Sequence, residues 1–372
     1  MKLFHLSDLH LGKRVNEFSM LEEQKNVLDQ IISASKLHRP DGVMIAGDVY
    51  DKSIPSTEAI DLFDDFICAL SELSIPVFII SGNHDSPERL AFGRRLMDKS
   101  GVYISPVYSR DCLPITLLDN YGAVNIYMLP FIKPVHARAA FPDEKIESYT
   151  DALSCAVKAM NIDAGKRNIL LAHQFVTGAS RSDSEEITVG GLDNVDATVF
   201  ESFDYVALGH IHRPQNIIEN KIRYCGTPLK YSFSEIGNDN SITVVELQQK
   251  GDVSISTIPL NPIHDMRKLR GTFDELILGS SEDYLGIVLT DEDYILNALD
   301  KLRNNYPNIM QLDYDNTQTK NRATLAELQQ IKETDPFALF SEFYQKQNNM
   351  PLSDEQSAFI KELIRSVWEE KE

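Results

Sequence analysis

The sequence predicts an α/β fold in which a mostly parallel β-sheet carries helices on its faces. Three observations support this prediction. Short apolar runs alternate with helical patterns through the first half of the chain, the runs are typical of buried strands, and several end in a polar residue of ligand type. A length of 372 residues, with 42% hydrophobic and 25% charged residues, is typical of a globular protein of two or three domains.

The elements of the first half are predicted in order. Buried strands are expected at "KLFHLSD", "GVMIAGD", "PVFIISGN", "NILLAHQ" and "DYVALGH". The stretch "SMLEEQKNVLDQIISASKL" predicts a helix that Ser19 and Glu22 would begin with a capping box. A second helix is predicted at "STEAIDLFDDFICALSEL", with one apolar face made of Ala59, Phe63, Phe66, Leu70 and Leu73. Ser86 and Pro87 are typical of a helix start, and "SITVVELQQKGDVSISTIPL" predicts a hairpin that turns at Lys250 and Gly251.

The pattern changes at "LNPIHD", which predicts a domain boundary. We expect a first domain over residues 1–262, a small α+β domain over 263–315, a polar linker over 316–334 and a helix-loop-helix tail over 335–372. In the α+β domain, "DEDYILNALDKLRNNYP" predicts a helix between the strands "YLGIVLT" and "IMQLDYD". Asp335 with Pro336, and Ser353 with Gln356, are typical helix starts in the tail.

Composition argues against several classes of protein. No apolar run reaches the length of a membrane span, and charge and histidine interrupt the N-terminal segment too early for a signal peptide. The four cysteines form no CxxC pair and are typical of a reduced, cytoplasmic protein. A formal net charge of −20 argues against nucleic-acid binding, although bound divalent cations change the local sign of the field.

Ligand-type residues stand at the ends of five predicted strands, in "SDLH", "AGDVYD", "SGNHD", "LLAHQ" and "GHIH". Ligands of an α/β sheet bind at the carboxyl ends of its strands, so we expect these side chains at one rim. His210 and His212 are two residues apart and should point to the same side of an extended chain. Carboxylate, amide and imidazole groups together suit a divalent metal such as manganese. Seven such residues suit two ions that share a carboxylate: Asp8, His10, Asp48, Asn83, His173, His210 and His212.

In kind and order these motifs resemble the D-x-H, GD-x-x-D, GNH-D/E, H and GH-x-H motifs of the calcineurin-like metallophosphoesterases. The resemblance covers residues 1 to about 260 and implies a sandwich of mixed β-sheets flanked by helices. It implies that Asp48 bridges two metals, that Asp8, His10 and His212 hold one ion, and that Asn83, His173 and His210 hold the other. It also implies that His84 is catalytic at the leaving oxygen and that the Asp51 carboxylate orients His84. Protein phosphatases carry "DRG" where this chain has "DKS", which argues against them.

Four stretches are similar to a narrower family, the bacterial SbcD nuclease subunits, which partner an SMC-like ATPase: "MKLFHLSDLHLG", "GDVYDKSIPS", "GNHDSPERL" and "CGTPLKYSFSE". The similarity implies a DNA exonuclease on duplex ends and endonuclease on single strands and hairpins, acting in repair, recombination and replication. It implies that the 263–315 domain caps the site and contacts DNA, that the tail docks on an SbcC-like ATPase, and that the chain forms a homodimer within a heterotetramer. Archaeal and eukaryotic relatives often carry His in place of Asp51, so a two-histidine mechanism is not implied here.

Two further sets of residues have an ordinary and a functional interpretation. Basic residues near the rim are either DNA backbone contacts or solvated helix faces: Lys13, Arg14, Arg89, Arg94, Arg95 and Arg213. The apolar stripe of the tail either packs on the body or fills a groove of a partner, with Phe337, Phe340, Tyr344, Ile364 and Trp368 as its main members.

Two other functions remain open. One is a free phosphomonoesterase or cyclic-nucleotide phosphodiesterase, for which the capping domain and tail would be superfluous. The other is a catalytically inactive adaptor on the same scaffold, against which the complete ligand set and His84 count.

Overall fold

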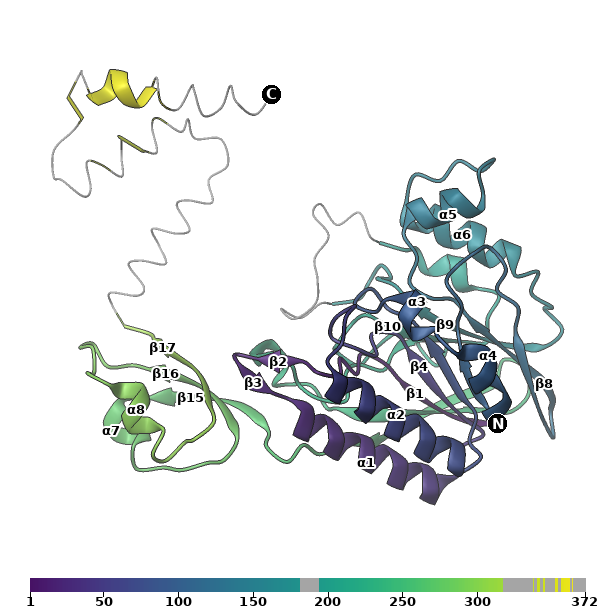
Figure 1. Ribbon diagram of the computed structural model, residues 1–372, viewed down its shortest axis with the longest axis horizontal. Coiled ribbons are helices and arrows are strands. Elements are labelled where there is room, and N and C mark those ends of the chain that lie inside the picture. The colour runs from purple at the N-terminus through teal and green to yellow at the C-terminus, as the bar shows by residue number, and fades with distance from the viewer. Residues whose placement is uncertain are drawn as a thin grey trace.

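The computed structural model describes residues 1–180 and 194–316, and in the C-terminal segment residues 337, 340–341, 344, 352–353, 356–361 and 363. Its larger part is built on two six-stranded β-sheets, and a smaller unit with its own sheet lies beside it (Figure 1). The strands of the first sheet, in spatial order, are β14 (Val253–Pro259), β13 (Ser241–Leu247), β1 (Lys2–Leu6), β4 (Gly42–Ala46), β5 (Val77–Ile80) and β6 (Val102–Ile104). Those of the second are β11 (Gln215–Ile218), β12 (Ile222–Tyr224), β10 (Tyr205–Gly209), β9 (Arg167–His173), β8 (Gly122–Met128) and β7 (Ile115–Asp119).

Both sheets are mixed, with parallel strands at the centre. In the first, β1, β4, β5 and β6 run parallel, while β13 pairs antiparallel with β1 and with β14. In the second, β8, β9, β10 and β12 run parallel, and β7 and β11 are antiparallel edge strands. The mixed sandwich expected from the resemblance is therefore confirmed.

The two sheets pack against each other through a layer of buried apolar side chains. Leu3, Met44 and Phe78 of the first sheet meet Ile126 and Leu171 of the second, and all five side chains are 0% exposed. The single sheet predicted from strand–helix alternation is thus wrong, because the five ligand-bearing strands divide between two sheets. A strand buried on both faces gives the same continuous apolar run whether a helix or a second sheet covers it.

Helices cover the outer face of each sheet. The other side chains of β1, β4 and β5 pack against α1 (Leu21–His38) and α2 (Thr57–Glu72), and those of β9 and β10 pack against α6 (Tyr149–Ala159). The remaining short elements are β2 (Arg14–Val15), β3 (Phe18–Ser19), α3 (Pro87–Leu90), α4 (Arg94–Met97), η1 (Asp98–Ser100), α5 (Pro134–Ala140), η2 (Ala197–Phe200) and η3 (Phe233–Glu235).

The helix start predicted at Ser86 and Pro87 is confirmed, the one predicted at Ser19 is wrong, and the one predicted at Asp335 and Pro336 lies outside the described residues. Ser56 accepts a hydrogen bond from Ala59 N at the start of α2, and Ser86 accepts one from Arg89 N at the start of α3, which has Pro87 at its first position. The capping box predicted for Ser19 is wrong, because α1 begins after Met20 with no side-chain cap. The main chain of Ser19 pairs with Arg14 in the β2–β3 hairpin, and this strand pairing places it outside the cap position.

The smaller unit is a three-stranded parallel sheet with two short helices, drawn in green at the lower left of Figure 1. Its elements are β15 (Met266–Gly271), α7 (Phe273–Leu276), β16 (Tyr284–Leu289), α8 (Ala298–Leu302) and β17 (Ile309–Tyr314). Strands and helices alternate, and Leu285, Ile287, Leu302 and Ile309 form a separate core. The helix predicted over 291–307 is shorter, because Asn297 has a left-handed backbone (φ 55°) immediately before α8. The domain limits at 262/263 and 315/316 stay predictions.

Candidate metal centre

All five predicted ligand-bearing strands end at the same end of the sandwich. β1 leads to Asp8 and His10, β4 to Asp48, β5 to Asn83, β9 ends at His173, and β10 leads to His210 and His212. The loops are tied to each other through the main chain, since Asp8 N donates to Gly47 O and His10 N donates to Asp48 O, both at 3.0 Å. The sequence expectation of one rim is met, although two sheets and not one supply it.

Two glycines allow the sheets to approach closely at this rim. A Cβ atom on Gly209 would collide with the carbonyl oxygen of Ala46 and with the His173 ring. A Cβ atom on Gly47, which also has a left-handed backbone (φ 90°), would collide with the same ring. The glycines of "AGD" and "LGH" therefore keep the ends of β4, β9 and β10 in contact, which brings the ligands of both sheets together.

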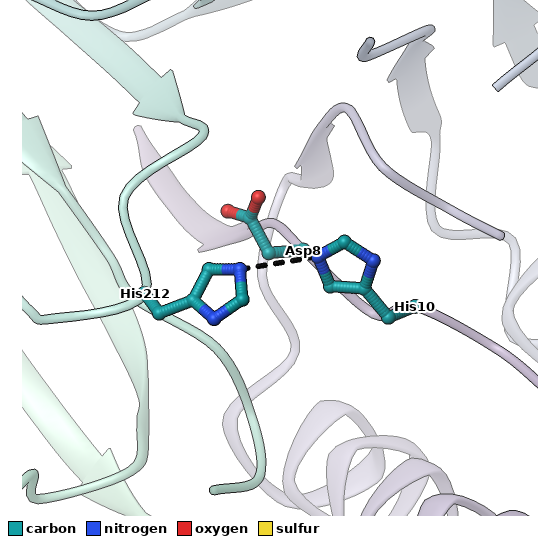
Figure 2. Close-up of side chains that lie close together, drawn as sticks. All are labelled: Asp8, His10 and His212. Carbon is teal, nitrogen blue, oxygen red and sulfur yellow. Dashed lines mark hydrogen bonds between the residues drawn. The ribbon is translucent and has the colours of Figure 1, made fainter. Parts of the chain in front are cut away.

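The first group of candidate ligands is Asp8, His10 and His212, whose ligand atoms all lie within 4.8 Å of one another (Figure 2). Nε2 of His10 lies 3.2 Å from Nε2 of His212. Two nitrogens that bind one cation at about 2.1 Å are separated by roughly 3.0–3.4 Å, so this spacing fits a shared ion. All three residues are buried. The Asp8 carboxylate also accepts hydrogen bonds from His210 N at 3.1 Å, which ties this group to the other.

The second group is Asn83, His173 and His210. Oδ1 of Asn83 lies 3.0 Å from Nε2 of His173 and 3.0 Å from Nδ1 of His210. Nδ1 of His173 donates to Ala46 O at 2.8 Å, so the ring presents its Nε2 lone pair to the site. One amide oxygen and two imidazole nitrogens within this range form a donor set that suits a borderline divalent metal.

Asp48 lies between the two groups. Its Oδ2 is 3.8 Å from Nε2 of His10 and 3.3 Å from Nε2 of His173, while its Oδ1 accepts a hydrogen bond from His84 N at 2.9 Å. The same carboxylate therefore reaches a ligand of each group, as the shared ligand of a two-ion site must.

His84 lies beside His10 and Asp48, and one ligand atom of each of these three residues lies within 4.8 Å of the others. Its Nε2 lies 4.0 Å from Asp48 Oδ2, and its ring packs edge-on against that of His10 with centroids 4.8 Å apart. Nδ1 lies 3.0 Å from the main-chain carbonyl oxygen of Asp51. The side chain is 19% exposed, so it borders solvent where the buried ligands do not.

The orienting role expected for the Asp51 carboxylate is wrong. Oδ1 of Asp51 lies 2.8 Å from Nζ of Lys13, whereas it is the carbonyl group of Asp51 that contacts His84. The physical reason is competition: the ammonium group of Lys13 is a strong charged donor to the carboxylate. The contact of Asp51 with His84 is made by its main-chain carbonyl group.

Burial and neighbouring charges set the titration of the metal-free site. Burial lowers the pKa of His10 well below its usual value and raises that of Asp8. Burial also acts to lower the pKa of His173, but the Asp48 carboxylate outweighs it and raises this pKa to about 9. Burial likewise opposes ionisation of Asp48, yet the charge of His173 holds the pKa of Asp48 below its usual range. Metals bind deprotonated ligands, so a metal bound here would compete with protons for this cluster.

Several supporting residues escaped the sequence analysis. Asp85 is buried and accepts hydrogen bonds from Val49 N, Tyr50 N and Gly82 N, which fixes the β4 and β5 loops to each other. Burial, with the charge of Asp48, raises the pKa of Asp85 to about 6. Glu235 contacts His212, and Gln24 contacts the His10 loop. Asp85 follows directly after "GNH" and could have been suspected, whereas Gln24 lies in an ordinary helical pattern.

The candidate DNA-contacting side chains differ in their exposure to solvent. Arg14, Arg89, Arg95 and Arg213 are exposed and Arg94 is half-buried. Lys13 turns inward to Asp51 and lies 5.7 Å from the centroid of the Tyr231 ring.

In the tail, Phe337, Phe340 and Tyr344 are half-buried, while Ile364 and Trp368 lie outside the described residues. Nζ of Lys361 lies 4.4 Å from the centroid of the Phe337 ring, and Gln356 Nε2 donates to Tyr344 Oη at 3.2 Å. The second tail helix begins with the predicted capping box, since Ser353 N donates to Gln356 Oε1 and Gln356 N donates to Ser353 Oγ.

Comparisons with known proteins agree with this geometry. Residues 1–214 match the Calcineurin-like phosphoesterase family, and residues 262–348 match the family described as Type 5 capsule protein repressor C-terminal domain. The D subunit of nuclease SbcCD from Staphylococcus epidermidis is 34% identical, and the alignment covers 99% of each chain. The protein of the same name from Staphylococcus saprophyticus is 35% identical over 100% of this chain and 99% of its own. The chain belongs to the SbcD family of calcineurin-like phosphoesterases.

Membership of the SbcD family agrees with the site as described, because all the motif residues of a metal-dependent phosphoesterase are present and converge. Among solved structures, protein TT1561 of Thermus thermophilus aligns with 69% of this chain and 98% of its own at 13% identity, with a TM-score of 0.40. The family assignment depends on the sequence relatives. In the part of the chain that the structure describes, no helix has the length and apolar character needed to cross a membrane.

Proposed function

We propose that the chain is a two-metal DNA nuclease that hydrolyses phosphodiester bonds as an exonuclease on duplex ends and an endonuclease on single strands and hairpins. The observation that carries the proposal is the position of Asp48 Oδ2, within 4 Å of a ligand nitrogen from each sheet, His10 Nε2 and His173 Nε2. A carboxylate in this position can bridge two cations. SbcD relatives that align over the full length are named as nucleases.

Each ion would have its own ligands besides the shared Asp48. Asp8, His10 and His212 would hold one ion, and Asn83, His173 and His210 the other. Manganese is the metal that best suits this mixture of oxygen and imidazole ligands. When bound, two such cations supply a nucleophilic water of lowered pKa and neutralise the charge of the phosphodiester.

The protein contributes the group that acts on the leaving sugar oxygen. His84 borders solvent with its Nε2 towards Asp48, and its Nδ1 donates to the carbonyl oxygen of Asp51. In this tautomer a protonated Nε2 can give its proton to the leaving oxygen, after which the ring is neutral and the Nδ1 contact is kept. The backbone contact fixes the ring plane through the reaction.

A partner would complete the enzyme. The net charge of −20 is poorly suited to holding duplex DNA, since phosphate contacts dominate affinity for nucleic acid. We propose that an SbcC-like SMC-type ATPase supplies much of the basic surface, that the tail docks on it, and that the nuclease acts as a homodimer within a heterotetramer in the cytoplasm. The 263–315 unit would contact the DNA beside the site.

The test compares three activities in one preparation. The purified chain is incubated with manganese and, in parallel, with hairpin DNA, linear duplex DNA and a small phosphate monoester. We expect cleavage of the hairpin and slow or no release of phosphate from the monoester. Fast monoester hydrolysis with intact hairpin DNA would show a free phosphatase, and no reaction with any substrate at full metal loading would show an inactive adaptor.

A further inference from the structure

Glu235 is a buried carboxylate beside the metal centre whose oxygens contact His212 and Tyr231. It ends the short 3₁₀ turn η3 and has 0% of its surface exposed. Its Oε1 lies 2.9 Å from Nδ1 of His212, and its Oε2 accepts a hydrogen bond from Tyr231 N at 2.8 Å. Burying a carboxylate without partners is energetically costly, and these contacts offset that cost.

The position of Glu235 is fixed relative to the loop that carries His10. Tyr231 Oη donates to Leu9 O at 2.5 Å, and Gln24 Nε2 donates to His10 O at 2.8 Å and lies 3.0 Å from Tyr231 Oη. Gln24 Oε1 accepts from Gly12 N at 3.0 Å. The segment before Glu235 and the segment around His10 are therefore joined by the Tyr231 side chain and by Gln24, which reaches across from α1.

The contact with Glu235 determines which nitrogen of His212 can bind a metal. A carboxylate accepts and does not donate, so Nδ1 of His212 carries the proton and Nε2 has the lone pair. Nε2 of His212 is the atom that lies 3.2 Å from Nε2 of His10, in the spacing of two ligands of one ion. A carboxylate on the far nitrogen of a ligand histidine also raises the basicity of the near one.

We propose that Glu235 is a positioning residue that holds His212 in its metal-binding tautomer and sets the affinity of the ion held by Asp8, His10 and His212. This inference rests on the two-metal site of the proposed function. The other ion should be independent of Glu235, because His173 is fixed by a different acceptor, Ala46 O at 2.8 Å.

The experiment measures binding of manganese to the metal-free, full-length chain by titration calorimetry and by loss of the free-ion signal in electron paramagnetic resonance, without DNA. We expect two binding events in the parent. Glu235→Ala should weaken one event roughly 10- to 100-fold and leave the other unchanged, the usual effect of removing such a partner. Glu235→Gln, which can still accept from Nδ1 but lacks the charge, should weaken the same event by less.

A matched control separates positioning from stability. Asn168→Ala removes buried side-chain hydrogen bonds to Asp163 O and Lys166 O at the start of β9, at the opposite end of that strand from His173, and touches neither Glu235 nor His212. We expect it to lower the melting temperature of the metal-free chain while both binding events keep their affinities. In a chain that already carries His212→Ala, adding Glu235→Gln should not lower the manganese affinity of the affected event further, because Glu235 acts through His212.

Three results would overturn the inference. The first is that both binding events keep their affinities in Glu235→Gln and in Glu235→Ala. The second is that both events are weakened equally. The third is that Glu235→Gln lowers the manganese affinity further in the His212→Ala background. If Glu235→Ala does not fold, Glu235→Gln decides alone. A parent that binds two ions but does not cut DNA would contradict the proposed function and leave this inference standing, whereas a parent that binds fewer than two would contradict both.

Discussion

Nδ1 of His84 lies 3.0 Å from the main-chain carbonyl oxygen of Asp51, and the Asp51 carboxylate lies instead 2.8 Å from Nζ of Lys13. The ring that faces the metal centre is therefore held by the backbone of the "GDVYD" loop. A backbone acceptor cannot be removed by substitution of its side chain, so the roles of His84 and of the Asp51 side chain can be separated experimentally.

His84→Ala should keep both metals and bind DNA, but cut roughly 10²- to 10⁴-fold more slowly, the usual contribution of a general acid. Single-turnover cleavage of a hairpin, with metal content measured by elemental analysis, checks this. Asp51→Asn is the matched comparison: it keeps the backbone contact and should slow cleavage by less than His84→Ala does. A parallel loss of metal in His84→Ala would make His84 a ligand and refute its assignment.

Asp48→Ala should abolish cleavage and lower the metal content, because it removes a carboxylate whose Oδ2 lies within 4 Å of a ligand nitrogen from each group. Elemental analysis after gel filtration should find up to two manganese ions per parent chain and clearly fewer in the variant. Asp64→Ala is a suitable control, since Asp64 is an exposed carboxylate on α2. Full activity of Asp48→Ala would rule out a two-metal mechanism.

Gly209→Ala should destabilise the protein by about 1–3 kcal/mol and impair metal loading, because the new methyl group would overlap Ala46 O and the His173 ring. Urea unfolding and manganese titration measure the two effects. Gly237→Ala is the control, since a Cβ there has no atom within 4 Å apart from its chain neighbours. Equal behaviour of the two variants would mean that the sheets do not need this close approach.

His5 should make the protein sensitive to acid. Burial, followed by the charge of Arg223, lowers its pKa from 6.5 to about 3, so the unfolded chain binds a proton between these values and the folded chain does not. The contribution of His5 to the free energy of unfolding is therefore full above pH 6.5 and decreases as the pH falls towards 3. At pH 5 the decrease is about 2 kcal/mol.

The comparison variant is His5→Asn, whose amide can replace the 2.9 Å contact between Nδ1 and Tyr205 Oη. Urea unfolding of both metal-free chains at pH 7.5 and pH 5 gives the difference in free energy of unfolding. The parent should lose about 2 kcal/mol more than the variant over this interval. Equal losses would show that His5 does not titrate in this way.

Truncation after Thr334 should leave a metal-loaded chain that nicks short single strands but no longer binds the ATPase. Size-exclusion chromatography with the ATPase heads tests this, together with Phe340→Ala and Tyr344→Ala in the full chain, since buried aromatic residues tend to carry interface energy. Co-elution of the truncated chain with the heads, as complete as that of the full-length chain, would mean that the tail has another role.

Much of the site could be predicted because its ligands follow strands, and a strand end is visible in sequence as an apolar run that stops at a polar residue. The strand pattern alone could not predict the division of those strands between two sheets, since both arrangements bury both faces of each strand; only the family resemblance implied a sandwich. Nor could the contact of Glu235 with His212 be predicted, since it crosses 23 residues and depends on how the "YSFSE" turn folds back. The Asp51 error has the same origin: sequence gives the carboxylate but not the direction in which the loop turns it.

Four of the seven proposed ligands, Asp8, His10, Asp48 and His210, have left-handed backbones, with φ of 53°, 44°, 49° and 97°. Each such residue costs about 1 kcal/mol, and together they remove a sizeable part of the roughly 5–15 kcal/mol that keeps a domain folded. An ion that binds only the folded chain raises the free energy of unfolding by about 2.7 kcal/mol when its free concentration is about a hundred times its dissociation constant. Newly made chains that meet no metal should therefore be digested fastest by cellular proteases, and the amount of this nuclease should follow the metal supply of the cell.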